Sequence, residues 1–341
     1  MSKRNKDFLL SVMSLVLLLT GCSATATAPD RQQNYADHPE AQSWIESMKA
    51  EGFTEAYLRQ VLSQAKRQDS IIKAMSRPAE KRLNWEQYSN IFVKPKRVDQ
   101  GVAFWHENQA ALARAAATYG VPEEIIVAII GVETRYGRIT GSYRVLDALA
   151  TLGFDYPKRG SFFQGQLTEY LRMVQEEQID FAALKGSYAG AMGYGQFIPS
   201  SFRAYAVDFD GDGKRDIWNN RVDAIGSVAN YFAEHKWRSS EPVLAPVVFN
   251  QPAQDEWFNQ SLKPSLTLSQ WREKGASAPL KFDENSPATL MKMELNTSEE
   301  YWFGLHNFYV ITRYNHSRLY AMAVYRLSEQ IKAAYQASQA G

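Results

Sequence analysis

One carboxylate in the sequence stands where a carboxylate is energetically costly. Glu133 follows Ile126, Ile129 and Ile130 at helical spacing, so a helix here would place all four side chains on one apolar face. A carboxylate among apolar side chains must be neutral, paired or at the edge of a cleft, and the loss of hydration raises its pKa. Such a group is suited to general acid catalysis.

The segment around this carboxylate predicts a helix with clear ends. Val121-Pro122-Glu123-Glu124 is typical of a helix start, and the helix is expected to run to about Tyr136 and to stop at Gly137. The alternative to catalysis is a structural ion pair with Arg135 or Arg138. Neither arginine lies three or four residues from the carboxylate, which weakens that alternative.

A second group of side chains suits a metal ion. Asp208, Asp210, Asp212, the main-chain carbonyl of Lys214, and Asp216 stand at alternating positions, with glycine sixth in the run, as in the first part of an EF-hand. Hard oxygen ligands of this kind suit calcium. Clustered acids repel one another without a cation, so calcium should stabilise the fold.

The closure of this loop departs from the EF-hand pattern. The twelfth position holds Asn219 in place of the bidentate glutamate, and Arg215 replaces an apolar residue. Asp223, at the start of the next helical run, is the best substitute. A solvated acidic turn is the alternative to a calcium site.

Other cofactors are not expected. The five histidines lack metal-ligand spacing, which argues against zinc. The glycine-rich segment 190–195 lacks the Gly-Lys-Ser/Thr of a phosphate loop, so it predicts close backbone contact with a ligand or another helix, and no nucleotide site. We expect no organic cofactor.

These side chains must be positioned by an α+β fold that is mainly helical. Residues 38–240 predict a helical region that holds the catalytic core and the calcium loop 208–223, residues 241–311 a small β-containing subdomain, and residues 312–341 a C-terminal helix packed on the core. The β-prone runs of the subdomain are Val243–Phe249, Leu290–Leu295, Tyr301–Phe303 and Phe308–Ile311.

The first residues predict export and a lipid anchor. Residues 1–21 have a basic start and an apolar stretch, as in a secretory signal. Leu19-Thr20-Gly21-Cys22 resembles the bacterial lipobox, which is cleaved before the cysteine that is then acylated. Cys22 is the only cysteine and can form no internal disulfide. Ser23 follows it, which by resemblance to lipoprotein sorting rules favours the periplasmic face of the outer membrane.

The composition of the chain limits the classes of partner that it is expected to bind. Residues 22–37 are polar and read as a tether between lipid and enzyme. Removal of residues 1–21 takes three basic and one acidic residue from 38 and 37, which leaves a net charge of −1. That charge gives no indication of nucleic-acid binding.

Three motifs, in order, are similar to those of the membrane-bound lytic murein transglycosylase B family. They are IIGVETRYG around Glu133, GSYAGAMGYGQFIPSS at Gly186–Ser201, and ITRYN at Ile311–Asn315, within a match from about Tyr88 to the C-terminal helix. The resemblance implies a lysozyme-like catalytic core with a helical appendage and a small β subdomain.

The resemblance also assigns roles. Glu133 would be the catalytic acid/base. The implied substrate-binding residues are Ser187, Gln196, Tyr314, Asn315, Tyr320, Tyr88 and Arg159. It further supports Asp223 as the residue that closes the calcium loop. Without the resemblance, Tyr314 and Tyr320 would be read as core aromatic residues.

The implied reaction cleaves the β-1,4 bond between N-acetylmuramic acid and N-acetylglucosamine and forms 1,6-anhydromuramoyl ends without water. Two alternatives stay open: a hydrolytic muramidase on the same fold, and a non-catalytic calcium-binding lipoprotein that binds peptidoglycan. A hydrolase could draw its second carboxylate from Asp147, Asp155, Glu169 or Asp180. We expect a monomer whose partners are glycan strands, the outer membrane through its anchor, and cell-wall synthesis proteins.

Overall fold

The computed structural model of the protein describes residues 35–76, 83–279 and 282–340. The predicted signal peptide, Cys22 and the tether up to residue 34 lie outside these residues. The end predicted for the tether, residue 37, is wrong. Tyr35 is buried against α8, where its hydroxyl donates to Asp155 Oδ2 at 2.6 Å, so the folded part has begun by Tyr35.

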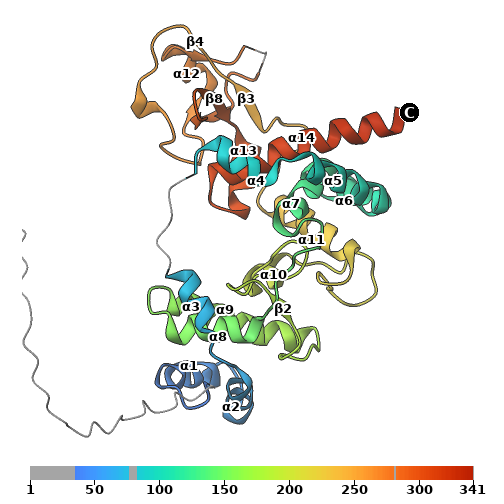
Figure 1. Ribbon diagram of the computed structural model, residues 1–341, viewed down its shortest axis with the longest axis vertical. Coiled ribbons are helices and arrows are strands. Elements are labelled where there is room, and N and C mark those ends of the chain that lie inside the picture. The colour runs from blue at the N-terminus through green and yellow to red at the C-terminus, as the bar shows by residue number, and fades with distance from the viewer. Residues whose placement is uncertain (1–34, 77–82, 280–281, 341) are drawn as a thin grey trace, which may run out of the picture. The chain divides into compact units, whose positions relative to one another are not determined.

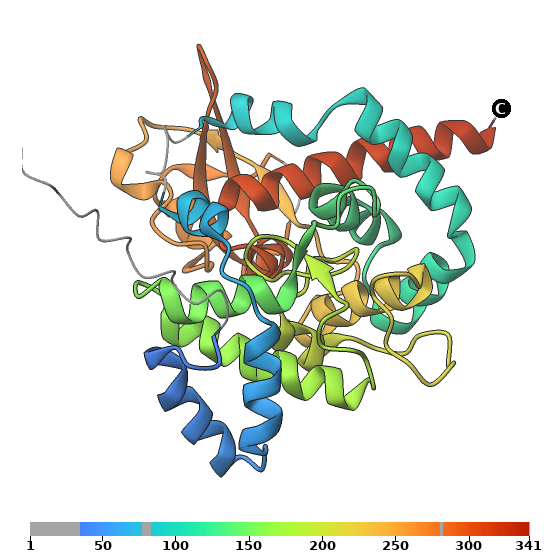
Figure 2. The same cartoon turned by 60° about the horizontal axis from the view of Figure 1, so that its bottom comes forward.

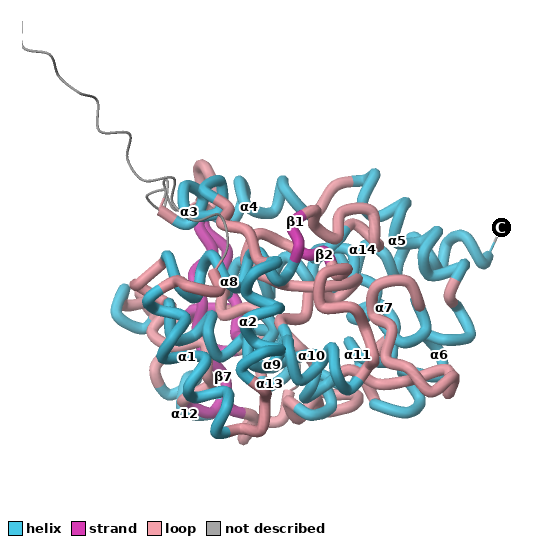
Figure 3. The backbone as a smooth tube through the Cα atoms, turned by 90° about the horizontal axis from the view of Figure 1, so that it is seen from below, coloured by secondary structure: helices cyan, strands magenta, loops and turns pink. Residues whose placement is uncertain are grey.

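Helices dominate the described backbone, with short strands between some of them (Figure 1, Figure 3). The helices are α1 Pro39–Ala50, α2 Glu55–Gln64, α3 Asp69–Met75, α4 Trp85–Phe92, α5 Pro95–Glu107, α6 Gln109–Tyr119, α7 Glu123–Thr134, α8 Val145–Asp155, α9 Gly160–Glu176, α10 Pro199–Tyr205, α11 Arg221–Glu234, α12 Leu268–Glu273, α13 His306–Tyr314 and α14 Arg318–Ala340. The strands are β1 Tyr143–Arg144, β2 Lys185–Gly186, β3 Leu244–Pro246, β4 Val248–Phe249, β5 Leu266–Thr267, β6 Ala276–Ser277, β7 Pro287–Glu294 and β8 Glu299–Gly304. The prediction of an α+β, mainly helical fold is confirmed.

Buried apolar side chains form three cores. The first core packs α4 to α7 against α11, α13 and α14, and the second packs α1 to α3 against α8, α9 and α10. The third core lies in the β-containing subdomain. Tyr314, at the end of α13, packs against both the first and the second core, so it lies where the two meet.

The β-containing subdomain is built on an antiparallel sheet in the order β3-β8-β7-β5. Its centre is the hairpin of β7 and β8 (Figure 2). The two strands pair from Thr289 opposite Gly304 to Glu294 opposite Glu299. Strands are found in three of the four predicted runs. The fourth prediction, a strand at Phe308–Ile311, is wrong, because these residues lie in α13.

Residues Phe308–Ile311 form a helix and not the predicted strand because of how they pack. Phe308 and Ile311, one helical turn apart, are both fully buried in the first core, and Val310 is also buried there. β-branched and aromatic residues have only a weak preference for strands, and burial of one helical face outweighs it. The C-terminal helix correspondingly begins at Arg318, six residues later than predicted, after α13 and a short turn.

None of the described helices is by itself long and apolar enough to cross a membrane. The pair α6 and α7 meets the length and composition limits jointly, with a bend of 114° between them.

Candidate active site

Glu133 lies in the last turn of α7, a helix that is buried on every side. All residues from Ile125 to Val132 are buried, with Pro122 as the N-cap. The sequence predicts one apolar face, whereas the helix is apolar on all its faces. Glu133 is the one carboxylate of α7 after its first turn. The Glu133 side chain is half-buried where the helix reaches the edge of the core.

The helix ends at Thr134, two residues earlier than predicted. Arg135 and Tyr136 both take left-handed backbone conformations, with φ of 51° and 62°. The Tyr136 ring turns back over Gly131, where a Cβ would lie 2.6 Å from its hydroxyl, and that hydroxyl donates to the Arg97 carbonyl at 2.8 Å. These contacts hold Tyr136 in a conformation that would otherwise be strained.

Thr134 joins the end of α7 to the glycine-rich segment 190–195. Its hydroxyl donates to the Tyr194 carbonyl at 3.0 Å and accepts from the Gly137 amide at 2.9 Å. Gly137 has a φ of 82°, and a Cβ there would lie 2.1 Å from the Tyr194 ring. No sequence pattern predicts this role of Thr134 beyond its position three residues before Gly137.

The carboxylate of Glu133 has one hydrogen-bond partner among the described residues. The hydroxyl of Tyr320, a buried residue in the first turn of α14, donates to Glu133 Oε1 at 2.5 Å. The predicted alternative of an ion pair with Arg135 or Arg138 is wrong, since no described cation lies within salt-bridge distance of Glu133. Arg138 instead donates to the Arg135 carbonyl at 3.3 Å.

Burial raises the pKa of Glu133 to about 7, and the hydrogen bond from Tyr320 offsets part of that increase. Burial also raises the pKa of Tyr88, Tyr314 and Tyr320, and the Glu133 charge adds to the increase in all three. Glu133 is therefore a carboxylic acid for much of the time near neutral pH, facing three neutral tyrosines.

Tyr314 connects this carboxylate to the glycine-rich segment. Its hydroxyl donates to the Gly195 carbonyl at 2.5 Å, and a Cβ on Gly195 would lie 2.8 Å from that hydroxyl. The Tyr314 ring stacks on Phe232 at a centroid distance of 5.7 Å. The close approach predicted for the segment is therefore a contact with an aromatic residue of the site.

The remaining predicted binding residues lie in different surroundings. Ser187 and Gln196 are half-buried on either side of the glycine-rich segment. Ser187 Oγ accepts from the Ala191 amide at 3.1 Å, and Gln196 Nε2 donates to the Thr140 carbonyl at 3.1 Å. Asn315 directly follows Tyr314 and is exposed.

Tyr88, Tyr314 and Tyr320 form a tyrosine group around Glu133. No hydrogen bond or ion pair among the described residues joins Arg159 to this tyrosine group. It is exposed before α9, with its guanidinium 4.4 Å from the Phe162 ring centroid. The structure thus brings together Glu133, Tyr88, Tyr314 and Tyr320.

The four carboxylates considered for a hydrolase are engaged elsewhere. Each accepts a hydrogen bond from a residue outside the tyrosine group: Asp147 from the Lys66 amide at 2.9 Å, Asp155 from Tyr35 at 2.6 Å, Glu169 from Arg172 at 2.5 Å, and Asp180 from the Ala182 amide at 2.9 Å. None contributes to the shifted pKa of Glu133, which burial and Tyr320 alone determine among the described residues.

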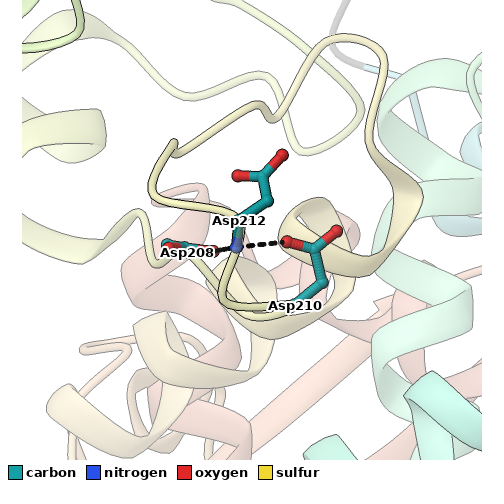
Figure 4. A group of neighbouring side chains, drawn as sticks. All are labelled: Asp208, Asp210 and Asp212. Carbon is teal, nitrogen blue, oxygen red and sulfur yellow. Dashed lines mark hydrogen bonds between the residues drawn. The ribbon is translucent and has the colours of Figure 1, made fainter.

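The loop predicted to bind calcium brings three acids together. Carboxylate oxygens of Asp208, Asp210 and Asp212 lie within 4.8 Å of one another (Figure 4). Asp208 also accepts from the Gly211 and Gly213 amides at 2.7 and 2.8 Å, so the backbone wraps around its side chain. Three converging carboxylates fit a hard divalent cation.

Asp216 and Asp223 lie outside this three-acid group. Asp223 is fully buried, and its two oxygens accept from the amides of Phe209 and Asp216 at 2.7 and 2.9 Å. Asp216 accepts from the Asn219 amide at 2.8 Å. Arg215, the residue that departs from the EF-hand pattern, turns away to pair with Glu177.

Comparison with known proteins identifies the family. The model of the transglycosylase SLT domain family matches residues 36–329. The membrane-bound lytic murein transglycosylase B of Escherichia coli K12 is 45% identical over 311 residues, 88% of this chain and 85% of that protein. The chain belongs to the lytic transglycosylase family.

Solved structures of this family have the same fold. Catenated lytic transglycosylase SltB1 of Pseudomonas aeruginosa is 47% identical and superposes with a TM-score of 0.86, over 89% of this chain and 100% of that one. The Escherichia coli lytic transglycosylase Slt35 is 44% identical with a TM-score of 0.81, over 90% and 98% of the two chains, and was solved in complexes with calcium and with bulgecin A. These likenesses confirm the predicted family and the lysozyme-like fold class.

The raised pKa of Glu133 predicts how stability depends on pH. Between pH 4.5 and about 7 the folded state keeps a proton on Glu133 that the unfolded state releases. The contribution of Glu133 to the free energy of unfolding is therefore full below pH 4.5 and is lost as the pH rises through 7. We expect the stability of Glu133→Gln relative to the wild type to rise by about 3 kcal/mol across this interval. Thermal unfolding across this pH range measures the difference, and a constant difference would contradict the buried acid.

The Tyr320 hydrogen bond predicts a shift in the pH profile of glycan cleavage. If protonated Glu133 is required, kcat/KM falls as the pH rises through about 7. Tyr320→Phe removes the bond that lowers the pKa, so the falling limb should move to higher pH and turnover should drop. Tyr325→Phe, on the same helix, is the control and should leave the limb in place. If the falling part of the pH profile stays in place in Tyr320→Phe, this hydrogen bond does not set the pKa of Glu133.

Proposed function

We propose that Glu133 performs both proton transfers of a lytic transglycosylase that cleaves the glycan strands of peptidoglycan. The protein is an enzyme of the lytic transglycosylase family. The observation that supports the role of Glu133 most directly is its chemistry: a half-buried carboxylic acid with a pKa near 7, held by one tyrosine hydroxyl.

The reaction begins with the acid form of Glu133. Its proton passes to the oxygen that joins N-acetylmuramic acid C1 to N-acetylglucosamine, and the C1–O bond breaks through an oxocarbenium-like state. Glu133 is then a carboxylate, and the Tyr320 hydroxyl donates to it. A low-polarity site makes that hydrogen bond strong while the charge exists.

The second step restores the acid. Glu133 takes the proton of the muramic acid C6 hydroxyl as O6 bonds to C1, which leaves a 1,6-anhydromuramoyl end and consumes no water. An internal nucleophile has a high effective concentration, so the reaction needs no second carboxylate. The engagement of Asp147, Asp155, Glu169 and Asp180 elsewhere supports this route over a two-carboxylate hydrolase.

The surrounding residues would position the sugar. Tyr88 and Tyr314 offer ring surface and hydroxyls beside Glu133, while Asn315 offers an exposed amide suited to an N-acetyl group. We also propose Ser187 and Gln196 as cleft residues. Arg159 is proposed as a contact farther along the strand, since its exposed guanidinium is not engaged with the tyrosine group.

Product analysis tests the reaction and Glu133→Gln tests the residue. Wild-type protein incubated with peptidoglycan should release fragments with anhydromuramoyl ends, detected by mass spectrometry. Glu133→Gln should lower turnover about 10³-fold, because general acid-base catalysis contributes on that scale. Glu123→Gln, at the other end of the same helix, should keep turnover.

Two results would count against these assignments. Reducing ends heavier by one water would make the enzyme a hydrolase. Unchanged turnover in a folded Glu133→Gln protein would remove Glu133 from the mechanism.

We propose that the loop 208–223 binds calcium as a structural ion. Asp208, Asp210 and Asp212 would supply carboxylate oxygens and Lys214 its carbonyl. Asp216 and Asp223 would complete or support the site. A calcium complex of the related Slt35 agrees with this proposal.

Calcium should therefore raise the melting temperature of the wild-type protein. A ligand at 100 times its Kd stabilises the folded state by about 2.7 kcal/mol, which corresponds to a shift on the order of 5 °C. Asp210→Asn should lose most of this shift, and Asp255→Asn, an exposed residue outside the loop, should keep it. A melting temperature that changes neither with added calcium nor with a chelator would rule out the calcium site.

We propose that the enzyme is anchored through acylated Cys22 at the periplasmic face of the outer membrane. Cys22 lies outside the described residues, so the proposal rests on Leu19-Thr20-Gly21-Cys22 and on the membrane-bound relative. Two or more acyl chains anchor a protein stably.

Cell fractionation tests the anchor. Cys22→Ser should move the protein from the membrane to the soluble fraction, because no acyl chain can be attached. Ser23→Asp should shift it from the outer to the inner membrane, whereas Ser23→Ala should not. A Cys22→Ser protein that stays in the outer membrane would contradict lipid anchoring.

A further inference from the structure

Five cations gather where the start of α5 meets the end of α7. Lys94, Lys96 and Arg97 stand at the start of α5, and Arg135 and Arg138 directly follow α7. None of the five forms an ion pair with a described residue, whereas most other arginines of the described chain do. We call these five residues the basic patch.

The arginines of the basic patch hold the two helices together and lie close to one another. Arg97 donates to the Gly131 carbonyl of α7 at 2.6 Å and to the Ile91 carbonyl of α4 at 3.5 Å. Arg138 donates to the Arg135 carbonyl at 3.3 Å. Burial lowers the pKa of Arg97, and the charge of Arg135 adds to the decrease. Like charges at this separation destabilise each other unless an anion lies between them.

No acid of the described chain neutralises the basic patch. The first turn of α5 has neither an acid nor a side-chain cap, so the positive end of the helix lies beside Lys96 and Arg97. The Nε atom of Arg135 is buried without a hydrogen-bond partner among the described residues. Asp99, in the next turn of α5, forms no ion pair with any described residue, and no arginine of the patch contributes to the pKa of Glu133. An anionic partner would relieve this excess of positive charge.

Apolar side chains are exposed beside these cations. Ile91, at the end of α4, is 44% exposed, and Ile139, next to Arg138, is 57% exposed. They belong to the few large apolar side chains that the described chain exposes. Cations and exposed apolar side chains on one surface are typical of proteins that bind anionic membranes, where the cations attract lipid phosphates and the apolar groups enter the interface.

The basic patch adjoins the active site. The Phe92 ring has its centroid 5.2 Å from that of Tyr88, and the Arg97 guanidinium lies 5.6 Å from the same Phe92 centroid. α5 also packs against α7, which carries Glu133 (Figure 1). A surface bound at the patch would therefore fix the orientation of the active site relative to that surface.

We propose that the basic patch docks on the anionic phospholipid surface of the membrane to which the enzyme is anchored. Residues 22–34 can span at most about 45 Å, so an anchored enzyme keeps its folded part near the bilayer. A short linker gives a high effective concentration, so even a weak affinity of the patch for lipid is sufficient. The inference rests on the proposed anchor, and it adds that the folded part itself binds lipid and is oriented by it.

Vesicle co-sedimentation tests the docking. The protein is residues 22–341 with Cys22→Ser, so that no acyl chain contributes. It should bind vesicles of phosphatidylglycerol and phosphatidylcholine in equal parts and not vesicles of phosphatidylcholine alone, and salt should weaken the binding. The double variant Lys94→Gln, Lys96→Gln should bind about 30-fold more weakly, since each cation near an anionic bilayer contributes about fivefold.

Matched variants show whether the effect belongs to the basic patch. Lys66→Gln with Lys73→Gln changes two exposed lysines near α3 and should leave vesicle binding unchanged. Ile91→Gln should weaken binding and keep its dependence on salt, because the variant removes an apolar contact and no charge. The patch lysine variant should also keep wild-type turnover of soluble glycan strands, since neither lysine takes part in the proposed reaction.

Three results would overturn the inference: equal binding to both kinds of vesicle, unchanged binding in the patch lysine variant, or binding of peptidoglycan but of no vesicle, which would assign the patch to the substrate. The proposed anchor and reaction fail on other measurements. A protein that is never acylated, or that releases no anhydromuramoyl ends, leaves the vesicle test valid.

Discussion

The site depends on one hydrogen bond between elements that are distant in sequence, from the Tyr320 hydroxyl on α14 to the Glu133 carboxylate on α7. Burial makes ionisation of Glu133 costly, and this bond supplies the stabilisation that keeps its pKa near 7. Without burial the group would be a poor acid at neutral pH, and without the bond it would be a poor base. The two proton transfers proposed for Glu133 need both influences at once.

The surrounding structure holds Glu133 and Tyr320 in position relative to each other. Thr134 attaches the end of α7 to the glycine-rich segment, and Tyr314 attaches that segment to the turn before α14. Gly137 and Gly195 permit these contacts because any side chain there would overlap an aromatic residue. A chain of short contacts thus runs from Glu133 through the segment and back to Tyr320.

The β-containing subdomain borders the site. Its loop 259–263 lines one cavity together with the turn 316–319 and Tyr88. The acid-rich loop 208–216 is attached to the start of α11 through buried Asp223, which accepts hydrogen bonds from the Phe209 and Asp216 amides.

The sequence alone determined the local features: the helix that carries Glu133, the acid-rich turn at 208–216, the mainly helical class, and three of the four β-prone runs. Each of these depends on contacts between near neighbours, which periodicity and spacing reveal. Only the tertiary structure decided the end of α7, the helix at Phe308–Ile311, the burial of Tyr35, and the grouping of Tyr88, Tyr314 and Tyr320 around Glu133. These depend on packing between segments that are distant in the sequence, such as Tyr320 and Glu133, 187 residues apart, which no local pattern specifies.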